Sequence, residues 1–214
     1  GSRRWIVEGG GAEGVEVGPA RHHLLSPRAH NVAIADGVEP MAGSGVLTAR
    51  VALDGAEALR LATTVHGPDH DHARLFLVLD DLSGMAVIDR FRWAGRALAF
   101  EGRLHLPSDA LVALSGPRRA LAQQDGRRLD VVAVPLRGQA AGMDAAIGRN
   151  DRPHAMQGFS ATGAGGLRPT PVLRYAFTGR DTVCGGVVLA ADAEAEQRLL
   201  RLLADEEVPR LVEA

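Results

Sequence analysis

Cysteine and lysine are the scarcest chemically informative residue types in this 214-residue chain. The one cysteine, Cys184, excludes a disulfide within the chain and any zinc site built from cysteines. All 24 basic residues are arginine, whose planar guanidinium suits bidentate binding of carboxylates such as those of acidic sugars. The net charge of -2 argues against a broad basic surface, so we expect no nucleic-acid partner.

Long apolar runs and aromatic residues are also few. No stretch approaches the roughly 20 apolar residues of a membrane-spanning helix, and we therefore expect no membrane partner. The start of the chain shows no signal-peptide pattern, and the sequence leaves the compartment open. Aromatics make up only 4%, which speaks against a surface that stacks sugar rings on tryptophan or tyrosine. Apolar residues still reach 46%, as in a protein with a packed core.

Glycine, with 26 residues, divides the chain into short apolar runs, a pattern typical of an antiparallel β protein. Asp54-Gly55 and Asp125-Gly126 lie between such runs and predict hairpin turns. Within residues 97–106 the apolar side chains share one parity, so His105 is expected on the opposite, wetter face. The strands predicted in this way are 5–7, 32–35, 46–53, 59–65, 74–79, 85–93, 97–106, 111–115, 128–134, 172–177 and 182–189.

One segment, residues 192–206, has helical periodicity. Leu199 and Leu203 belong to its apolar stripe, Asp192 is placed to cap its start, and Pro209 follows its end. Residues 138–148 and 161–171 are expected to be long loops. We predict an all-β fold: a single antiparallel β-sandwich domain over residues 1–214 with one C-terminal helix.

Histidines supply the main candidates for chemistry. The segment 66–72 holds three histidines and two aspartates, and His66, His70 and His72 are candidate ligands for zinc or a similar ion. The alternative is a solvated polar loop, which Gly67-Pro68 favours. His30, at the entry of the strand 32–35, is by spacing alone more typical of a structural hydrogen-bonding residue.

The other reactive residue types point to packing. Cys184 lies in an apolar run beside two glycines, where a buried and inert thiol is expected. Tyr175, the only tyrosine, lies inside a predicted strand. No nucleophile elbow, phosphate-binding loop or dinucleotide fingerprint occurs. Composition and spacing alone therefore lead to a β-sandwich with clustered histidines.

The segment Ser-Pro-Arg-Ala-His-Asn-Val-Ala-Ile-Ala-Asp-Gly, residues 26–37, resembles the C-terminal β-sandwich of heparinase II/III-like proteins. Three further stretches resemble that family in the same order: His-Ala-Arg at 72–74 before a strand, Leu-His-Leu-Pro at 104–107, and Gly-Phe-Ser at 158–160 leading to residues 172–177. The resemblance spans roughly residues 3–190.

The resemblance implies a function in polysaccharide cleavage. Family members join an N-terminal α/α toroid to this sandwich and cleave uronic-acid polysaccharides by β-elimination. A base removes the proton at C5, an acid assists departure of the oxygen at C4, and the neighbouring carboxylate must be neutralised. A tyrosine and histidines transfer the protons, and a mainly structural zinc is held by histidine and aspartate.

Two residues match the family's zinc ligands. His30 corresponds to the histidine of Ala-His-Asn, and Glu8 stands where the family has an aspartate before a glycine. The remaining ligand, a catalytic histidine and the toroid with its tyrosine would lie outside these residues, and Tyr175 does not match that tyrosine. No catalytic residue is therefore predicted here.

Three hypotheses remain open from the sequence. In the first, the chain is the supporting sandwich of a heparinase II/III-like lyase, is inactive by itself, acts with an acidic polysaccharide, and is partnered either by the toroid or by a second copy of itself. Alternatively, it is a non-catalytic module that binds a glycan or a partner protein. The third possibility is a small metalloprotein centred on the histidines of residues 66–72.

Overall fold

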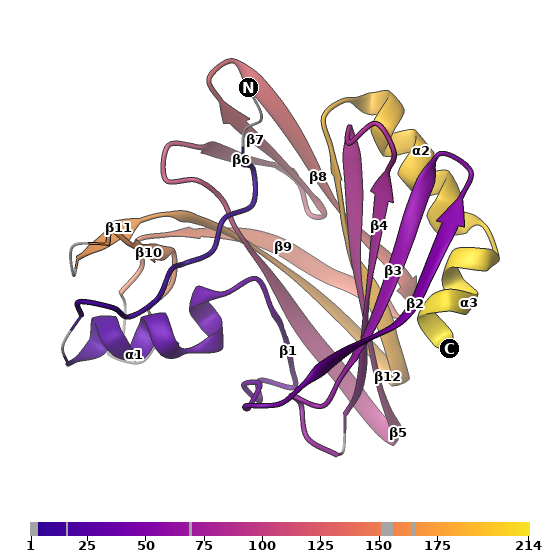
Figure 1. The fold of residues 1–214 in the computed structure, drawn as a ribbon, viewed down its shortest axis with the longest axis horizontal. Coiled ribbons are helices and arrows are strands. Elements are labelled where there is room, and N and C mark those ends of the chain that lie inside the picture. The colour runs from indigo at the N-terminus through magenta and orange to yellow at the C-terminus, as the bar shows by residue number, and fades with distance from the viewer. Residues whose placement is uncertain (1–3, 16, 69, 151–155, 164–165) are drawn as a thin grey trace.

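The computed structural model describes residues 4–15, 17–68, 70–150, 156–163 and 166–214. Antiparallel strands dominate it, with helices toward the two ends of the chain (Figure 1). The helical elements are α1 (Pro19–Leu25), the 3-10 turn η1 (Pro27–Ala29), α2 (Ala193–Ala204) and α3 (Glu207–Glu213). The strands are β1 (Ala33–Ala35), β2 (Gly45–Leu53), β3 (Ala56–Thr63), β4 (Asp71–Leu79), β5 (Gly84–His105), β6 (Leu111–Gly116), β7 (Arg119–Gln124), β8 (Arg127–Arg137), β9 (Gln139–Ile147), β10 (Phe159–Ala161), β11 (Leu167–Pro169) and β12 (Pro171–Ala190).

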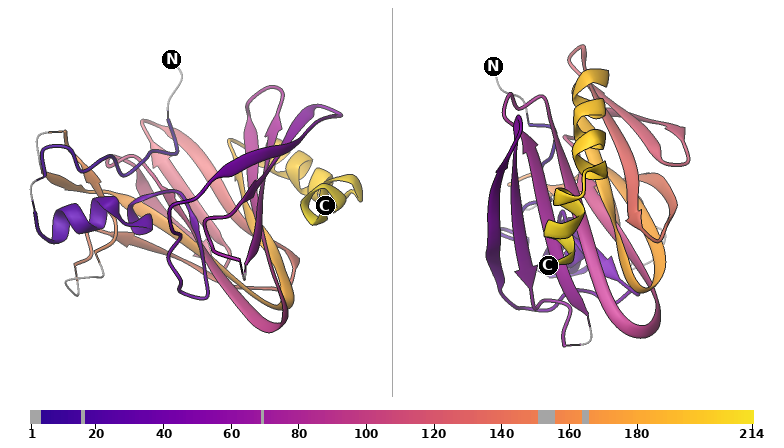
Figure 2. Two further views of the ribbon diagram at one scale, coloured as in Figure 1. Left: turned by 60° about the horizontal axis from the view of Figure 1, so that its bottom comes forward. Right: turned by 90° about the vertical axis from the view of Figure 1, so that its right-hand side faces the viewer.

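Two long strands, β5 and β12, pair with each other and form the spine of the main sheet. The strand order is β2-β3-β4-β5-β12-β8-β7-β6, with β1 added on β5 and β9 added on β12. The first half of β5 pairs with β4 and its second half with β1, so the sheet changes neighbours along its spine and bends. Its parts therefore pack as layers (Figure 2), as the predicted sandwich requires.

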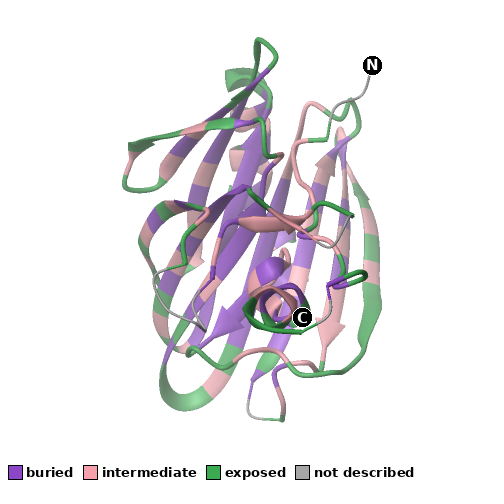
Figure 3. Ribbon diagram, turned by 90° about the vertical axis from the view of Figure 1, so that its left-hand side faces the viewer, coloured by how far each residue is buried: buried purple, intermediate pink, exposed green. Residues whose placement is uncertain are grey.

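The larger core lies inside the bent sheet, where buried residues form a continuous band (Figure 3). Phe91, Phe100 and Phe177 lie at its centre. The ring centroid of Phe100 is 5.1 Å from that of Phe91 and 5.2 Å from that of Phe177. These side chains come from both long strands, so residues far apart in sequence are joined by one core.

A second core lies between the opposite face of the sheet and the C-terminal helices. Helix α2 starts at the predicted cap, where the Asp192 side chain accepts the N–H of Ala195 at 2.9 Å. Leu199 and Leu203 are completely or nearly buried against the sheet, as the helical periodicity predicted. Each such leucine contributes roughly 1.5–3 kcal/mol to folding. Within the described residues no helix has the length and apolar character needed to cross a membrane.

Two pairs of predicted strands are in fact single strands. Residues 85–93 and 97–105 belong to β5, and residues 172–177 and 182–189 belong to β12. Gly95, with φ +80°, bends β5 without reversing it, and its N–H is held by Asp181 Oδ1 at 2.6 Å. The strand predicted at 5–7 is absent: Val7 contributes one backbone hydrogen bond, to His105 O at 2.9 Å.

Three further differences lie at the ends and loops. Most of the predicted loop 138–148 is the strand β9, whose backbone pairs with β12 and whose Asp144 binds Arg174. Helix α1 was not predicted. The helix predicted over 192–206 is α2, and the short helix α3 follows it, because Pro209 lies in the first turn of α3, where a backbone N–H would have no acceptor within the helix.

Candidate functional site

Glu8 and His30, the two residues expected from the resemblance to bind zinc, lie side by side. His30 Nδ1 is 2.9 Å from Glu8 Oε2, and the two side chains are 38% and 59% exposed. An ionised carboxylate only accepts hydrogen bonds, so Nδ1 carries a hydrogen, and in the neutral form of the ring Nε2 has a free lone pair. The contact therefore leaves one imidazole nitrogen able to act as a ligand or as a base.

Asn31 holds this pair in place. Its Nδ2 donates to Glu8 Oε1 and to the carbonyl oxygen of Val7, both at 2.8 Å. Its Oδ1 accepts the backbone N–H of His105 at 2.7 Å. Because one amide joins the N-terminal segment to the end of β5, the position of Glu8 depends on Asn31.

Two further histidines lie near the pair and are buried. His105 and His23 each have an Nε2 without a hydrogen-bond partner among the described residues. Burial lowers the pKa of His105 to about 4 and also lowers the pKa of His23. The parity predicted for His105 is correct, but the expected wetter face is not: the residue is completely buried, and its Nδ1 lies 3.3 Å from Asn31 Oδ1.

The site is connected to the core by a buried ion pair. Arg74 Nη1 donates to the carbonyl oxygen of Asn31 at 2.9 Å, while its Nε and Nη2 bind Asp89 at 2.8 Å and 3.0 Å. Burial opposes ionisation of Asp89, but Arg74 and His72 outweigh it and hold the pKa of Asp89 well below its ordinary value. This network was not predicted from the sequence. The signal that could have indicated it is Asp89, a single acidic residue within the predicted strand 85–93, where a buried carboxylate needs a partner.

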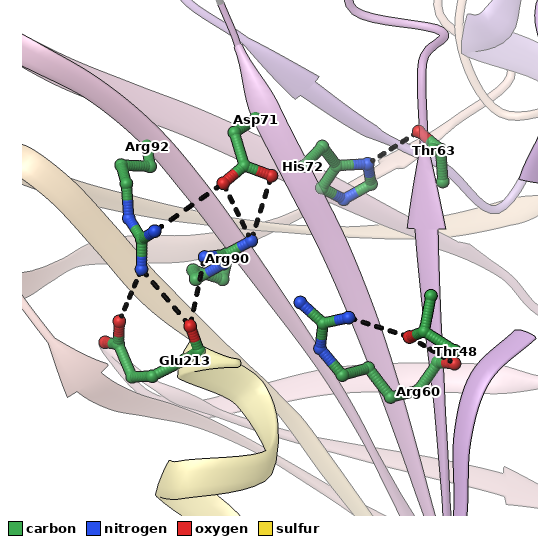
Figure 4. Close-up of polar contacts among 8 residues, drawn as sticks. All are labelled: Thr48, Arg60, Thr63, Asp71, His72, Arg90, Arg92 and Glu213. Carbon is green, nitrogen blue, oxygen red and sulfur yellow. Dashed lines mark hydrogen bonds and ion pairs between the residues drawn. The ribbon is translucent and has the colours of Figure 1, made fainter. Parts of the chain in front are cut away.

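The histidines of residues 66–72 pack into the core. His72 stacks on Phe91 at 4.2 Å, and His66 meets His72 edge-on at 4.7 Å. Both ring nitrogens of His72 are engaged, Nδ1 with Thr63 Oγ1 at 3.2 Å (Figure 4) and Nε2 with Asp89 Oδ1 at 2.7 Å. His70 has a different hydrogen-bond partner: its Nε2 lies 3.2 Å from Asp36 Oδ2. Asp69, of the same segment, lies outside the described residues.

Zinc in proteins usually has four ligands at a structural site. Within the described ranges, no group of three or more histidine, cysteine, aspartate or glutamate side chains is arranged to hold a metal ion. Glu8 and His30 match zinc in their chemistry but supply only two donors. The zinc site therefore stays a prediction that needs donors from elsewhere.

The remaining reactive side chains are packed, as predicted. Tyr175 is 1% exposed, and burial raises the pKa of its hydroxyl above the ordinary value. Burial likewise raises the pKa of the Cys184 thiol to about 12. Neither group is available for proton transfer or nucleophilic attack.

Comparison with known proteins finds no family model and no curated protein sequence that matches the chain. Solved structures do match. The heparan sulfate lyase HepC from Pedobacter heparinus superimposes with a TM-score of 0.71 and 14% identity, over 88% of this chain and 28% of that chain. The chain has the fold of part of heparinase III.

Two other heparinase III structures agree. One, with methylated lysines, has a TM-score of 0.69 and 13% identity, and the match covers 90% of this chain and 29% of that chain. The other has a TM-score of 0.68 and 10% identity, and the match covers 88% of this chain and 28% of that chain. The chain thus spans less than a third of the heparinase III chains that it matches. The family resemblance inferred from residues 26–37 is confirmed at the level of the fold.

Proposed function

We propose that this chain is the β-sandwich domain of a heparinase II/III-like polysaccharide lyase and forms one wall of a cleft for uronic-acid glycans. The observation that carries the proposal is the contact of Glu8 with His30 in a sandwich of heparinase III fold. The two residues were matched to the family from sequence alone, 22 positions apart, and the fold brings their side chains to 2.9 Å.

In this proposal the chain supports catalysis and does not perform it alone. β-Elimination needs a base for the C5 proton and an acid for the leaving oxygen. The only tyrosine of the chain, Tyr175, is buried in the core and reaches no substrate. The proton-transfer groups therefore belong to an additional helical domain, and an acidic polysaccharide is the substrate.

Glu8 and His30 are the residues of this chain that would hold the structural zinc of the family. When bound, the ion would neutralise Glu8 and fix the imidazole ring. Independently of the metal, Asn31 orients the Glu8 carboxylate, and Arg74 fixes the backbone of Asn31.

A lyase assay tests the proposal. We expect this chain alone to form no unsaturated uronate from heparan sulfate or alginate, and the longest natural polypeptide that contains it to do so. In that polypeptide Glu8→Gln should lower kcat/KM at least tenfold. Glu57→Gln is the matched control, because Glu57 is also a partly exposed glutamate in an ion pair, with Arg50.

The outcomes separate the parts of the proposal. Cleavage by the 214-residue chain alone would show that it carries catalytic groups. A longer polypeptide that cleaves no uronate polysaccharide would exclude the lyase function. Equal losses from both glutamine variants would remove the special role of Glu8.

A role as a glycan-stacking module gains no support from the tryptophans. The guanidinium of Arg96 lies 4.0 Å from the ring centre of Trp93, and the same ring meets His70 edge-on at 4.6 Å. Trp5 packs against the main core. Both rings are partly buried and contact other parts of the protein, which disfavours a role in sugar stacking.

A further inference from the structure

A cluster of arginines lies on the helix-covered face of the sheet. It consists of Arg60 on β3, Arg90 and Arg92 on β5, and Arg137 on β8. We call it the outer arginine cluster. It contacts two carboxylates, Asp71 on β4 and Glu213 at the end of α3 (Figure 4).

The strand register places the two most buried arginines on the same face. Arg60 pairs with Leu75, and Arg90 pairs with Ala73. Ala73 and Leu75 are two residues apart on β4 and therefore point to the same side. In Figure 4 the side chain of Arg60 extends from β3 toward Arg90.

The charges in this cluster do not balance. Arg90 Nη2 binds Asp71 at 3.0 Å, Arg92 Nη2 binds Glu213 at 3.0 Å, and Arg137 also faces Glu213. Arg60 is only 7% exposed, and its Nη1 donates to the hydroxyl of Thr48 at 2.7 Å. Among the residues that the structure describes, Arg60 has no carboxylate partner.

Buried donors in the cluster are also unsatisfied. The Nε atoms of Arg60 and Arg90 are inaccessible and have no hydrogen-bond acceptor in the described chain. Burial lowers the pKa of Arg90; Asp71 opposes this shift, whereas the positive charges of Arg92 and Arg60 add to it. A buried guanidinium without a counter-charge is costly, and an oxyanion offers both the charge and the acceptors that are missing.

We propose that the outer arginine cluster binds an oxyanion, a sulfate or carboxylate group held between Arg60 and Arg90. Arg92, whose side chain is 43% exposed, lies on the other side of Arg90 from Arg60 (Figure 4) and adds positive charge next to the site. This site lies on the face of the sheet covered by α2 and α3 and involves neither Glu8 nor His30, so it does not depend on the proposed lyase function.

Thermal unfolding with sodium sulfate, at constant ionic strength set with chloride, tests the site. Sulfate stabilises most proteins by exclusion from their surface, so the comparison between variants decides. Saturation should raise the Tm of the wild type by about 2–4 °C more than that of Arg60→Met. Arg50→Met is the matched control, because Arg50 is an exposed arginine on the neighbouring strand β2, paired with Glu57.

An equal rise of Tm in the wild type and Arg60→Met would overturn the proposal. If Arg60→Met does not fold, Arg92→Gln replaces it and should at least halve the sulfate-dependent rise; an unchanged rise would again reject the site. Calorimetry with inorganic sulfate and with methyl glucuronide distinguishes the sources. Tighter binding of the glucuronide supports a glycan-borne group, tighter binding of sulfate supports a free ion, and binding of neither contradicts the proposal.

Discussion

The ring of Tyr175 lies directly over Gly102 on the neighbouring strand. The two residues are paired in the register of β12 and β5, and a Cβ built on Gly102 would lie 2.2 Å from the ring carbons. Tyr175 is 1% exposed because this glycine leaves room for its ring. The same contact keeps the only tyrosine of the chain away from any substrate.

Gly102→Ala should therefore destabilise the protein by about 1–3 kcal/mol or more, because the new methyl group forces Tyr175 and the backbone apart. Chemical denaturation measures the change. Gly116→Ala is the control, since Gly116 also lies in a strand and a Cβ there meets no atom within 4 Å. A loss of stability from Gly116→Ala as large as that from Gly102→Ala would contradict this explanation.

Asp89→Asn should cost about 3–5 kcal/mol, because it leaves the guanidinium of Arg74 buried without its counter-charge. Asp144→Asn is a close control: Asp144 also binds an arginine on the neighbouring strand, Arg174, but is 53% exposed, and its loss should cost less than about 1 kcal/mol. Similar losses for the two variants would show that burial does not decide the strength of these pairs.

The Asp89 pair also predicts acid sensitivity. The pKa of Asp89 is lower in the folded state than in the unfolded chain, so its stabilisation is present above the unfolded value of about 4. It is lost as the pH falls through the lower folded value. Urea titrations below pH 4 should show a steep loss of stability in the wild type and a shallower one in Asp89→Asn.

Buried histidines predict a second pH window. Burial lowers the pKa of His66 and of His105 from 6.5 to about 4 in the folded state. The unfolded chain therefore binds more protons between these values, and the free energy of unfolding should fall as the pH drops from about 6.5 to 4. His66→Phe keeps an aromatic ring and removes one titrating group, so its stability should fall less steeply. Parallel curves for wild type and variant would rule out His66 as a cause.

Asn31→Ala should destabilise the protein by about 2–4 kcal/mol, because it removes four hydrogen bonds of one side chain and leaves partly buried backbone groups of Val7 and His105 without that partner. Asn31→Asp should cost more, since a second carboxylate would face Glu8. The exposed Asn150 gives the control, where alanine should change stability by less than about 0.5 kcal/mol. If Asn31→Asp were as stable as the wild type, the amide would not orient Glu8.

Local patterns predicted much of the framework for identifiable reasons. Asp54-Gly55 and Asp125-Gly126 connect paired strands as predicted, and at the second turn both residues have positive φ, which this dipeptide tolerates. The α2 helix begins at Asp192, because its side chain caps the first turn. Strand β9 was missed because glycine and alanine carry almost no periodic signal, although pairing with β12 makes them a strand.

The candidate site was only partly visible in the sequence. Glu8 and His30 were found through a family resemblance, and no spacing rule relates residues 22 positions apart. Asn31, Arg74 and Asp89 were not predicted as a network, since their contacts arise from the register of β4 on β5 and from the N-terminal segment crossing the sheet.

The sequence by itself determined the β-rich class, the hairpin turns, the capped helix and the single inert cysteine, because each depends on neighbouring residues and their conformational preferences. Tertiary structure alone decided that two pairs of strands become the long strands β5 and β12. It also decided which polar side chains meet: Glu8 with His30, Asp89 with Arg74, and Arg60 with no carboxylate in the described chain. Such encounters depend on strand register and burial, which are properties of the whole packed sheet.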